Sequence, residues 1–268
     1  MEKAKEELEN VILSREGNVA TITLNRPQAL NAVSPGLIRD LTEAVRKVAK
    51  DENIRAVILT GAGRSFCAGG DIDEDVSQVC KMKPDEYIKY VKWFYEPFKG
   101  IVGMEKPVIA AIRGHAIGGG LDLAVACDIR IASQGARLGN AYVRMGIVPE
   151  LGQSYFLPRL VGIGRAKLLT FTGDFITAEE AERIGLVEKV VPEEELDKTA
   201  RDLAERLAKG PTKTIAMTKM AINKSLSMDF ESSSDYCWRL NLSLLQTEDH
   251  HEAFTAFLEK RQPTFKGF

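Results

Sequence analysis

The sequence predicts an α/β fold with a helical C-terminal region, and three observations support this. Strand and helix patterns alternate along the first two thirds of the 268-residue chain, as is typical of an α/β layer architecture. Glycine-rich loops at residues 61–71 and 114–122 each follow a continuous apolar run. After about residue 192, strand patterns become rare and helical periodicity continues. We therefore expect a core over residues 1–191 and a helical region over residues 192–268.

The N-terminal elements follow from turn and capping signals. Two short β-rich runs, residues 11–13 and 19–24, are separated by a Gly-Asn pair and predict a hairpin. Ser34 and Pro35 then stand in the order of an N-cap and a proline at the first helical position. Apolar residues recur behind them at helical spacing, so we expect a helix there.

Buried strands are predicted from continuous apolar runs. Residues 56–60 form such a run, which ends at Gly61, as expected of a strand covered on both faces. Residues 108–112 and 128–132 predict two further strands. Residues 84–99, which lie between the first glycine-rich loop and these strands, show helical periodicity and predict a helix. Apolar helices at a chain end, such as those expected after residue 192, often pack on a neighbouring subunit, although packing on their own domain is equally allowed.

The composition excludes several classes of protein. Lys and Arg total 36 and Asp and Glu total 38, so the basic excess that nucleic-acid binding usually shows is missing. No apolar stretch approaches the roughly 18–20 residues that span a bilayer, and the charged first ten residues carry no secretory signal. The four cysteines are scattered and only three histidines could join them, so we expect no metal site. We therefore predict a cytoplasmic protein with free thiols that binds neither nucleic acid nor membrane.

The two glycine-rich loops do not match nucleotide-binding motifs. The P-loop pattern GxxxxGK followed by Ser or Thr is absent, and GAGRSF places Phe66 where the dinucleotide pattern needs its last glycine. Glycines at strand ends are most often ordinary tight turns, although they also permit close backbone approach to a ligand. A helix that begins at such a loop offers free N–H groups to an anion. On spacing alone, both interpretations stay open.

Longer motifs resemble those of a known family. Five segments occur in the family's order: SFCAGGDI, KPVIAAIRGHAIGGGLDLAVACDIRIAS, GIVPELGQSYFLPRLVG, TGDFITAEEAERIGLVEKVV and AFLEKRQPTF. With them, the chain resembles the enoyl-CoA hydratase/isomerase (crotonase) superfamily from Val11 to Phe265. The resemblance implies a crotonase-like spiral of ββα repeats with a C-terminal helical trimerisation region. It also implies an acyl-CoA thioester as substrate, no cofactor beyond the substrate's own coenzyme A, and a homotrimer or homohexamer.

An oxyanion hole is implied by the same resemblance, built from the backbone N–H groups of Gly70 and Gly119. When a thioester loses its α-proton, the carbonyl oxygen takes up negative charge, and two preorganised donors stabilise that charge. Side chains are not needed for this task, which agrees with glycine at both positions.

The acidic positions distinguish the reactions of the family. Hydratases carry glutamates at the positions of Asp122 and Tyr142, so this chain departs from their pair. Family members that shift double bonds carry their acid/base at the position of Glu150. We therefore expect an enoyl-CoA isomerase in which Glu150 takes the C2 proton of a 3-enoyl-CoA and returns it at C4.

Other interpretations stay open. A hydratase could use Asp122 with Glu150, and acyl-CoA thioester hydrolases of the family also place an acid at the Glu150 position. One branch of the family binds AU-rich RNA, which the charge balance disfavours. Without the resemblance, Glu150 is typical of an exposed acid at a helix start, and Asp122 of an acid that stabilises a helix N-terminus.

Substrate-binding residues are also implied by the resemblance. Phe66, Tyr142 and Met145 are expected to form walls that exclude water. Further contacts to the thioester or to coenzyme A are expected from Arg26, Ala29, Ala68, Asp71, Ile72, Phe257 and Lys260. Lys260 would act across a subunit boundary, and Asp73 stands where many members place a phosphate-binding lysine.

Overall fold

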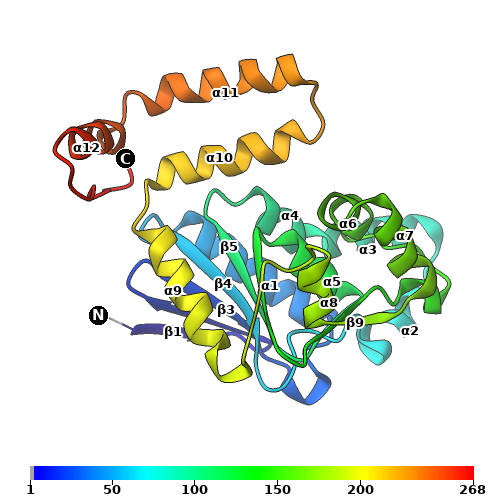
Figure 1. Cartoon of the computed structure of the whole chain (residues 1–268). Coiled ribbons are helices and arrows are strands. Elements are labelled where there is room, and N and C mark those ends of the chain that lie inside the picture. Colours follow the sequence, from blue (N-terminus) through cyan, green and yellow to red (C-terminus); the bar gives the residue numbers. More distant parts are fainter. Residues whose placement is uncertain (1–2) are drawn as a thin grey trace.

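A seven-stranded sheet forms the centre of the protein, whose residues 3–268 are described by a computed structural model (Figure 1). The strand order is β1-β2-β3-β4-β5-β7-β10, and a second, three-stranded sheet has the order β6-β8-β9. Strands β1 to β3 pair antiparallel, and the pairs from β3 to β10 are parallel. The strands are β1 (Lys3–Glu7), β2 (Val11–Glu16), β3 (Val19–Leu24), β4 (Ala56–Gly61), β5 (Val108–Ile112), β6 (His115–Ile117), β7 (Ile129–Ser133), β8 (Arg137–Gly139), β9 (Phe175–Thr177) and β10 (Lys189–Val191).

Helices follow most of the strands and dominate the C-terminal part (Figure 1). The α-helices are α1 (Pro35–Lys50), α2 (Ser77–Val79), α3 (Pro84–Phe94), α4 (Glu96–Gly103), α5 (Gly119–Ala126), α6 (Gln153–Val161), α7 (Ile163–Thr172), α8 (Ala178–Arg183), α9 (Leu196–Ala208), α10 (Thr212–Ser225), α11 (Phe230–Leu244) and α12 (Glu248–Leu258). Short turns complete the chain: 3₁₀ turns η1 (Pro27–Ala29), η3 (Tyr142–Met145) and η4 (Glu193–Glu195), and a π-helical turn η2 (Ile72–Val76).

The predicted N-terminal elements are confirmed. Strands β2 and β3 form the expected hairpin, with Val11 opposite Leu24. Ser34 caps α1 by accepting a hydrogen bond from the Leu37 amide. Strand β1 was not expected, because its charged residues carry no apolar pattern; it lies at the sheet edge, where charged side chains are common and discourage pairing with other chains.

One predicted helix is wrong in its extent. The helix expected over residues 84–99 ends at Phe94, and α4 begins at Glu96. Pro97 explains the break, because proline has no N–H and clashes with the preceding turn inside a helix but is accepted in the first turn of a new one. The apolar period continues across the break, which is why the pattern alone joined the two helices.

Two cores cover the two faces of the main sheet. Along β4, Val57 and Leu59 pack into the larger core with α1 and α4, whereas Ile58 packs into the smaller core beneath α9. Alternate residues of a strand point to opposite faces, so a strand buried on both faces is apolar throughout. The buried strand predicted at residues 56–60 is therefore confirmed, as is the α/β class.

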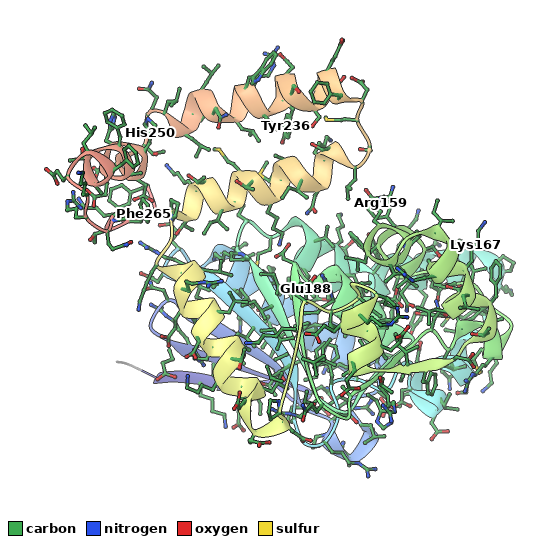
Figure 2. The ribbon with its side chains drawn as sticks, in the orientation of Figure 1. Arg159, Lys167, Glu188, Tyr236, His250 and Phe265 are labelled. Atoms are coloured by element: carbon green, nitrogen blue, oxygen red, sulfur yellow. The ribbon has the colours of Figure 1, made fainter. Side chains whose placement is uncertain are left out.

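The helices after residue 192 divide into two groups. Helix α9 packs on the sheet, with Leu196 and Ala200 buried, whereas α10 to α12 project from the core as an arm (Figures 1 and 2). Large apolar side chains are exposed along this arm: Met220, Ile222, Leu226, Phe230, Trp238, Leu242, Leu245, Phe254, Phe257 and Leu258. The domain boundary after residue 191 and the oligomerisation role of the C-terminal region stay predictions.

A membrane crossing would need a long apolar helix. Among residues 3–268, none of the helices has the necessary length and apolar character. The cytoplasmic location expected from the sequence stays a prediction.

Candidate active site

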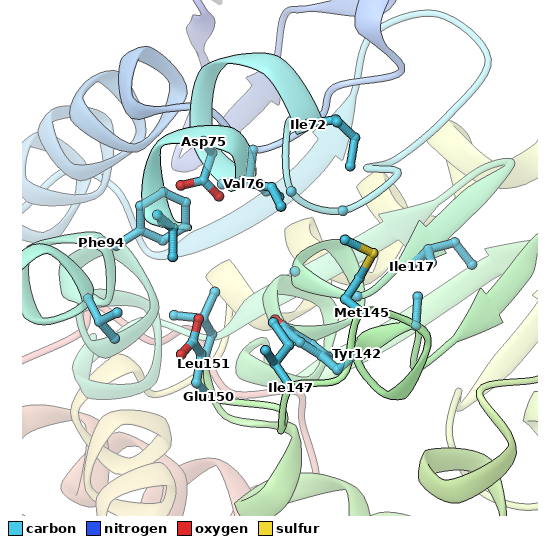
Figure 3. A pocket seen from close by; sticks show the side chains of 18 of the residues that line it. Ile72, Asp75, Val76, Phe94, Ile117, Tyr142, Met145, Ile147, Glu150 and Leu151 are labelled. Carbon is cyan, nitrogen blue, oxygen red and sulfur yellow. The ribbon is translucent and has the colours of Figure 1, made fainter. Parts of the chain in front are cut away.

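A cavity of about 280 Å³ lies where the two glycine-rich loops meet helix α3 (Figure 3). Gly70 of the first loop and Gly119 of the second both line it. Most of the remaining wall is apolar, including Val76, Phe94 and Leu151. Such a cavity, mostly apolar with a few polar groups, is typical of a small-molecule site.

Backbone hydrogen bonds hold the two loops against each other. The Val33 amide donates to Gly69 (2.7 Å) and the Val33 carbonyl accepts from the Asp71 amide (2.9 Å). The Gly70 nitrogen lies 4.0 Å from the position that a Cβ on Gly119 would occupy. Gly119 begins α5, so its N–H has no partner within the helix. Within residues 3–268 neither amide donates to another group of the protein, so two neighbouring N–H donors are available at the cavity.

Glu150 lies in the loop before α6 and lines the cavity. Its carboxylate accepts a hydrogen bond from the hydroxyl of Tyr87 on α3. Burial, followed by this bond and the Glu150 charge, raises the pKa of Tyr87 to about 12, so the phenol keeps its proton and remains a donor. The buried neighbour Leu151 anchors the loop, while Glu150 itself stays exposed to solvent.

Asp122 is fully buried behind Tyr142. Its carboxylate accepts the Tyr142 hydroxyl (2.6 Å), the Gln153 backbone amide (2.8 Å) and the Gln153 side-chain amide (2.8 Å). Burial raises the pKa of Asp122 to about 6, although all three bonds lower it. Tyr142 lines the cavity and Asp122 is not among the described residues that do, so Asp122 faces the cavity only through Tyr142.

Asp75 is a cavity carboxyl group that the sequence motifs did not reveal. It lies in η2, is 9% exposed, and accepts the hydroxyl of Tyr90 at 2.6 Å. Burial raises the pKa of Asp75, the Tyr90 bond opposes this, and the charge of Glu150 adds to it. Two spacings could have indicated the group: Asp75 follows Asp71 by four residues, and Tyr87 and Tyr90 are three apart on one helix face.

Most of the residues expected to form the cavity wall do line it, but one does not. Ala68, Ile72 and Met145 line the cavity together with Tyr142. Phe66 does not, and this prediction is corrected: the ring is fully buried in the larger core. The Phe66 amide donates to the Arg113 carbonyl (2.7 Å), which fixes the backbone so that the side chain packs inward, where burying an aromatic ring stabilises the fold.

Arg26 is held in a network at the base of the first loop. Its guanidinium donates to Asp71 (2.8 Å), to Glu74 (2.6 Å) and to the Ala32 carbonyl (2.8 Å), and the residue is only 7% exposed. Ala29 lies beside it in η1. These bonds tie residues 26–32 to the loop, and a contact from Arg26, Ala29 or Asp71 to coenzyme A stays a prediction.

Phe257 and Lys260 are not brought to the cavity within one chain. Phe257 is 79% exposed on α12, and Lys260 follows that helix. Figure 1 shows α12 at the opposite end of the molecule from α2. Their expected role across a subunit boundary stays a prediction.

A metal site would need several ligating side chains close together. Among residues 3–268, no three His, Cys, Asp or Glu side chains are grouped so that they could hold a metal ion. The expectation that neither a metal nor an organic cofactor takes part stays a prediction.

Comparisons with known proteins agree on one family. The family model described as enoyl-CoA hydratase/isomerase matches residues 14–267. The chain is 42% identical to the short-chain-enoyl-CoA hydratase of Clostridium acetobutylicum, with 98% of each chain covered. It is 36% identical to the 1,2-epoxyphenylacetyl-CoA isomerase of Escherichia coli, covering 97% of this chain and 99% of that one. The crystal structure of an enoyl-CoA hydratase from Bacillus anthracis matches with a TM-score of 0.91 at 36% identity, over 97% of this chain and 100% of that chain.

Proposed function

The chain belongs to the enoyl-CoA hydratase/isomerase family, and within it we propose an enoyl-CoA isomerase that moves a double bond from C3–C4 to C2–C3 of an acyl-CoA thioester. The crotonase fold expected from the sequence is confirmed by the match to solved members of the family. One observation carries the proposal: Glu150 lines the cavity, whereas Asp122 and Tyr142, at the positions of the hydratase pair, are bonded to each other.

In this proposal the thioester carbonyl binds at the two glycine amides. The free N–H groups of Gly70 and Gly119 donate to the carbonyl oxygen. Removal of the C2 proton moves negative charge onto that oxygen, where preorganised donors stabilise the enolate more than the neutral thioester.

Glu150 acts as the base. Its carboxylate takes the C2 proton, and the electron pair of that C–H bond moves toward the carbonyl group to form a dienolate. Protonation of the dienolate at C4 then consumes the C3–C4 double bond and leaves a double bond between C2 and C3. One carboxyl group that reaches both carbons suffices for this balance. Tyr87 orients the carboxylate by its hydrogen bond, and the apolar wall limits the access of water to the enolate.

A hydratase is the second candidate, because the Clostridium relative carries that name. Water would then be activated between Asp122 and Glu150. The geometry favours this less, because three donors already occupy the Asp122 carboxylate and the Tyr142 ring separates it from the cavity.

Product analysis tests the proposal. The purified protein should convert trans-3-hexenoyl-CoA to trans-2-hexenoyl-CoA, and should add water to trans-2-hexenoyl-CoA much more slowly. Both reactions can be followed by mass spectrometry, with ¹⁸O-labelled water reporting hydration. Rapid hydration with negligible double-bond migration would instead establish the hydratase, and release of free coenzyme A from either thioester would indicate a hydrolase.

We also propose that the arm of helices α10 to α12 joins subunits. Its exposed apolar residues form a surface that isolated soluble chains rarely leave uncovered. The protein should therefore sediment as a trimer or hexamer at micromolar concentration. Replacing the exposed Trp238 by glutamate should shift the distribution toward smaller species, and a wild-type protein that sediments as a monomer would contradict this proposal.

A further inference from the structure

We propose that Asp75 is a second acid/base residue of this site, delivering to C4 the proton that balances the one taken by Glu150 from C2. The inference rests on the proposed isomerase function and divides its two proton transfers between two carboxyl groups. Figure 3 shows Asp75 and Glu150 on opposite sides of the cavity, and both line it.

Two tyrosines of helix α3 donate hydrogen bonds to the two carboxyl groups. Tyr90 donates its hydroxyl to Asp75 (2.6 Å), and Tyr87 donates to Glu150. Residues three apart on a helix share a face, so one turn of α3 supplies a phenol to each wall of the cavity. The arrangement fixes two carboxyl groups that come from distant parts of the chain, η2 and the loop before α6.

Asp75 also lies beside the predicted oxyanion hole. Its Oδ1 accepts the Tyr90 hydroxyl, while its Oδ2 lies 3.4 Å from the position that a Cβ on Gly70 would occupy. Because Gly70 is also the expected carbonyl-binding position, the proposal places the acyl carbons of the thioester on the Asp75 side of the cavity. Tyr90 does not donate to Oδ2, so Oδ2 is the oxygen that carries the proton in this proposal.

The environments of the two carboxyl groups suit different tasks. Asp75 is 9% exposed, and its burial raises its pKa; the Tyr90 hydrogen bond opposes this shift and the Glu150 charge adds to it, so the net direction is toward the protonated acid. Glu150 is exposed to solvent and is the base of the proposed function. Paired carboxyl groups in unlike environments commonly divide into one acid and one base.

The proton balance is complete without a co-reactant. Glu150 takes the C2 proton, the dienolate forms, and the Asp75 carboxylic acid protonates C4 as the C2–C3 double bond is set. Glu150 is then protonated and Asp75 ionised. Glu150 releases its proton to solvent and Asp75 regains one after product leaves, so each cycle adds a solvent-derived proton at C4.

Two reactions distinguish the roles of the two carboxyl groups. Exchange of the C2 protons of hexanoyl-CoA in deuterium oxide needs only the base and the oxyanion hole. Migration of the double bond in trans-3-hexenoyl-CoA also needs protonation at C4. We expect Asp75→Asn to lower kcat for migration about 10²-fold or more while C2 exchange stays within about threefold of wild type. Glu150→Gln should lower both.

Matched variants control for structure and charge. Asp85→Asn makes the same substitution at an exposed position in the first turn of α3, the helix that carries Tyr90, and should leave both reactions at wild-type rates. Tyr90→Phe keeps the Asp75 carboxyl group but removes its hydrogen bond, and should slow migration several-fold without slowing C2 exchange. This variant keeps the test valid if Asp75→Asn does not fold.

The outcomes distinguish the inference from the function on which it rests. If Asp75→Asn and Tyr90→Phe migrate the double bond within threefold of wild type, or lose C2 exchange as severely as migration, the role of Asp75 is overturned and the isomerase proposal stands. If the wild type does not move the double bond of trans-3-hexenoyl-CoA, the isomerase proposal itself fails, whether or not C2 exchange is seen.

Discussion

Replacing Glu150 by glutamine should lower kcat for double-bond migration about 10²–10⁴-fold, the range typical of a lost general base. Glutamine keeps the size of the side chain and can still accept the Tyr87 hydroxyl, so the loop before α6 should keep its conformation. Because the side chain is exposed, the fold should lose little stability. Steady-state kinetics should show a fall in kcat with KM nearly unchanged, the signature of an interaction made in the transition state.

Asp122→Asn is the matched control. It makes the same acid-to-amide change one layer behind the cavity wall, where the carboxylate holds Tyr142 and Gln153. We expect a smaller loss than for Glu150→Gln, because Asp122 acts only by positioning Tyr142. Equal losses in the two variants, or activity of Glu150→Gln close to that of wild type, would contradict the assignment of Glu150 as the base.

Local signals predicted the elements of the fold, and long-range contacts set their limits. The run at residues 56–60 gave the correct strand because burial on both faces demands apolar residues throughout. The strand at Lys3–Glu7 could not be predicted in this way, since pairing with β2 gives its charged residues a place at the sheet edge. The break before Glu96 was missed because the apolar period crosses it.

In the candidate site too, local motifs predicted some residues, whereas others depend on long-range contacts. Gly70, Gly119 and Glu150 belong to contiguous motifs, and all three line one cavity. Asp75 and Tyr90 belong to no such motif, and their hydrogen bond depends on how α3 lies over the first loop. Phe66 belongs to a motif, yet whether its ring faces the cavity or the core depends on backbone pairing with the second loop.

The glycine-rich second loop should tolerate no side chain at Gly120. A Cβ there would lie 2.1 Å from the Cys67 carbonyl oxygen and 2.8 Å from its carbonyl carbon, far inside van der Waals contact. Cys67 cannot move away easily, because its amide donates to His115 (2.8 Å) and its carbonyl accepts from Ile117 (3.1 Å). The first loop must then separate from the second, and with it Gly70 from the amide of Gly119.

Gly120→Ala should therefore lower the free energy of unfolding by more than about 3 kcal/mol, the upper range for overpacking in a rigid core. Gly164→Ala is the matched control, because a Cβ on this α7 glycine meets no atom within 4 Å; there alanine should change the stability by at most about 1 kcal/mol, toward greater stability. Urea unfolding followed by circular dichroism measures both. Any folded Gly120→Ala protein should also have lost most of its thioester turnover, because the two N–H donors no longer converge on one oxygen. A Gly120→Ala protein as stable and active as the Gly164→Ala control would show that the two loops need not touch for the site to form.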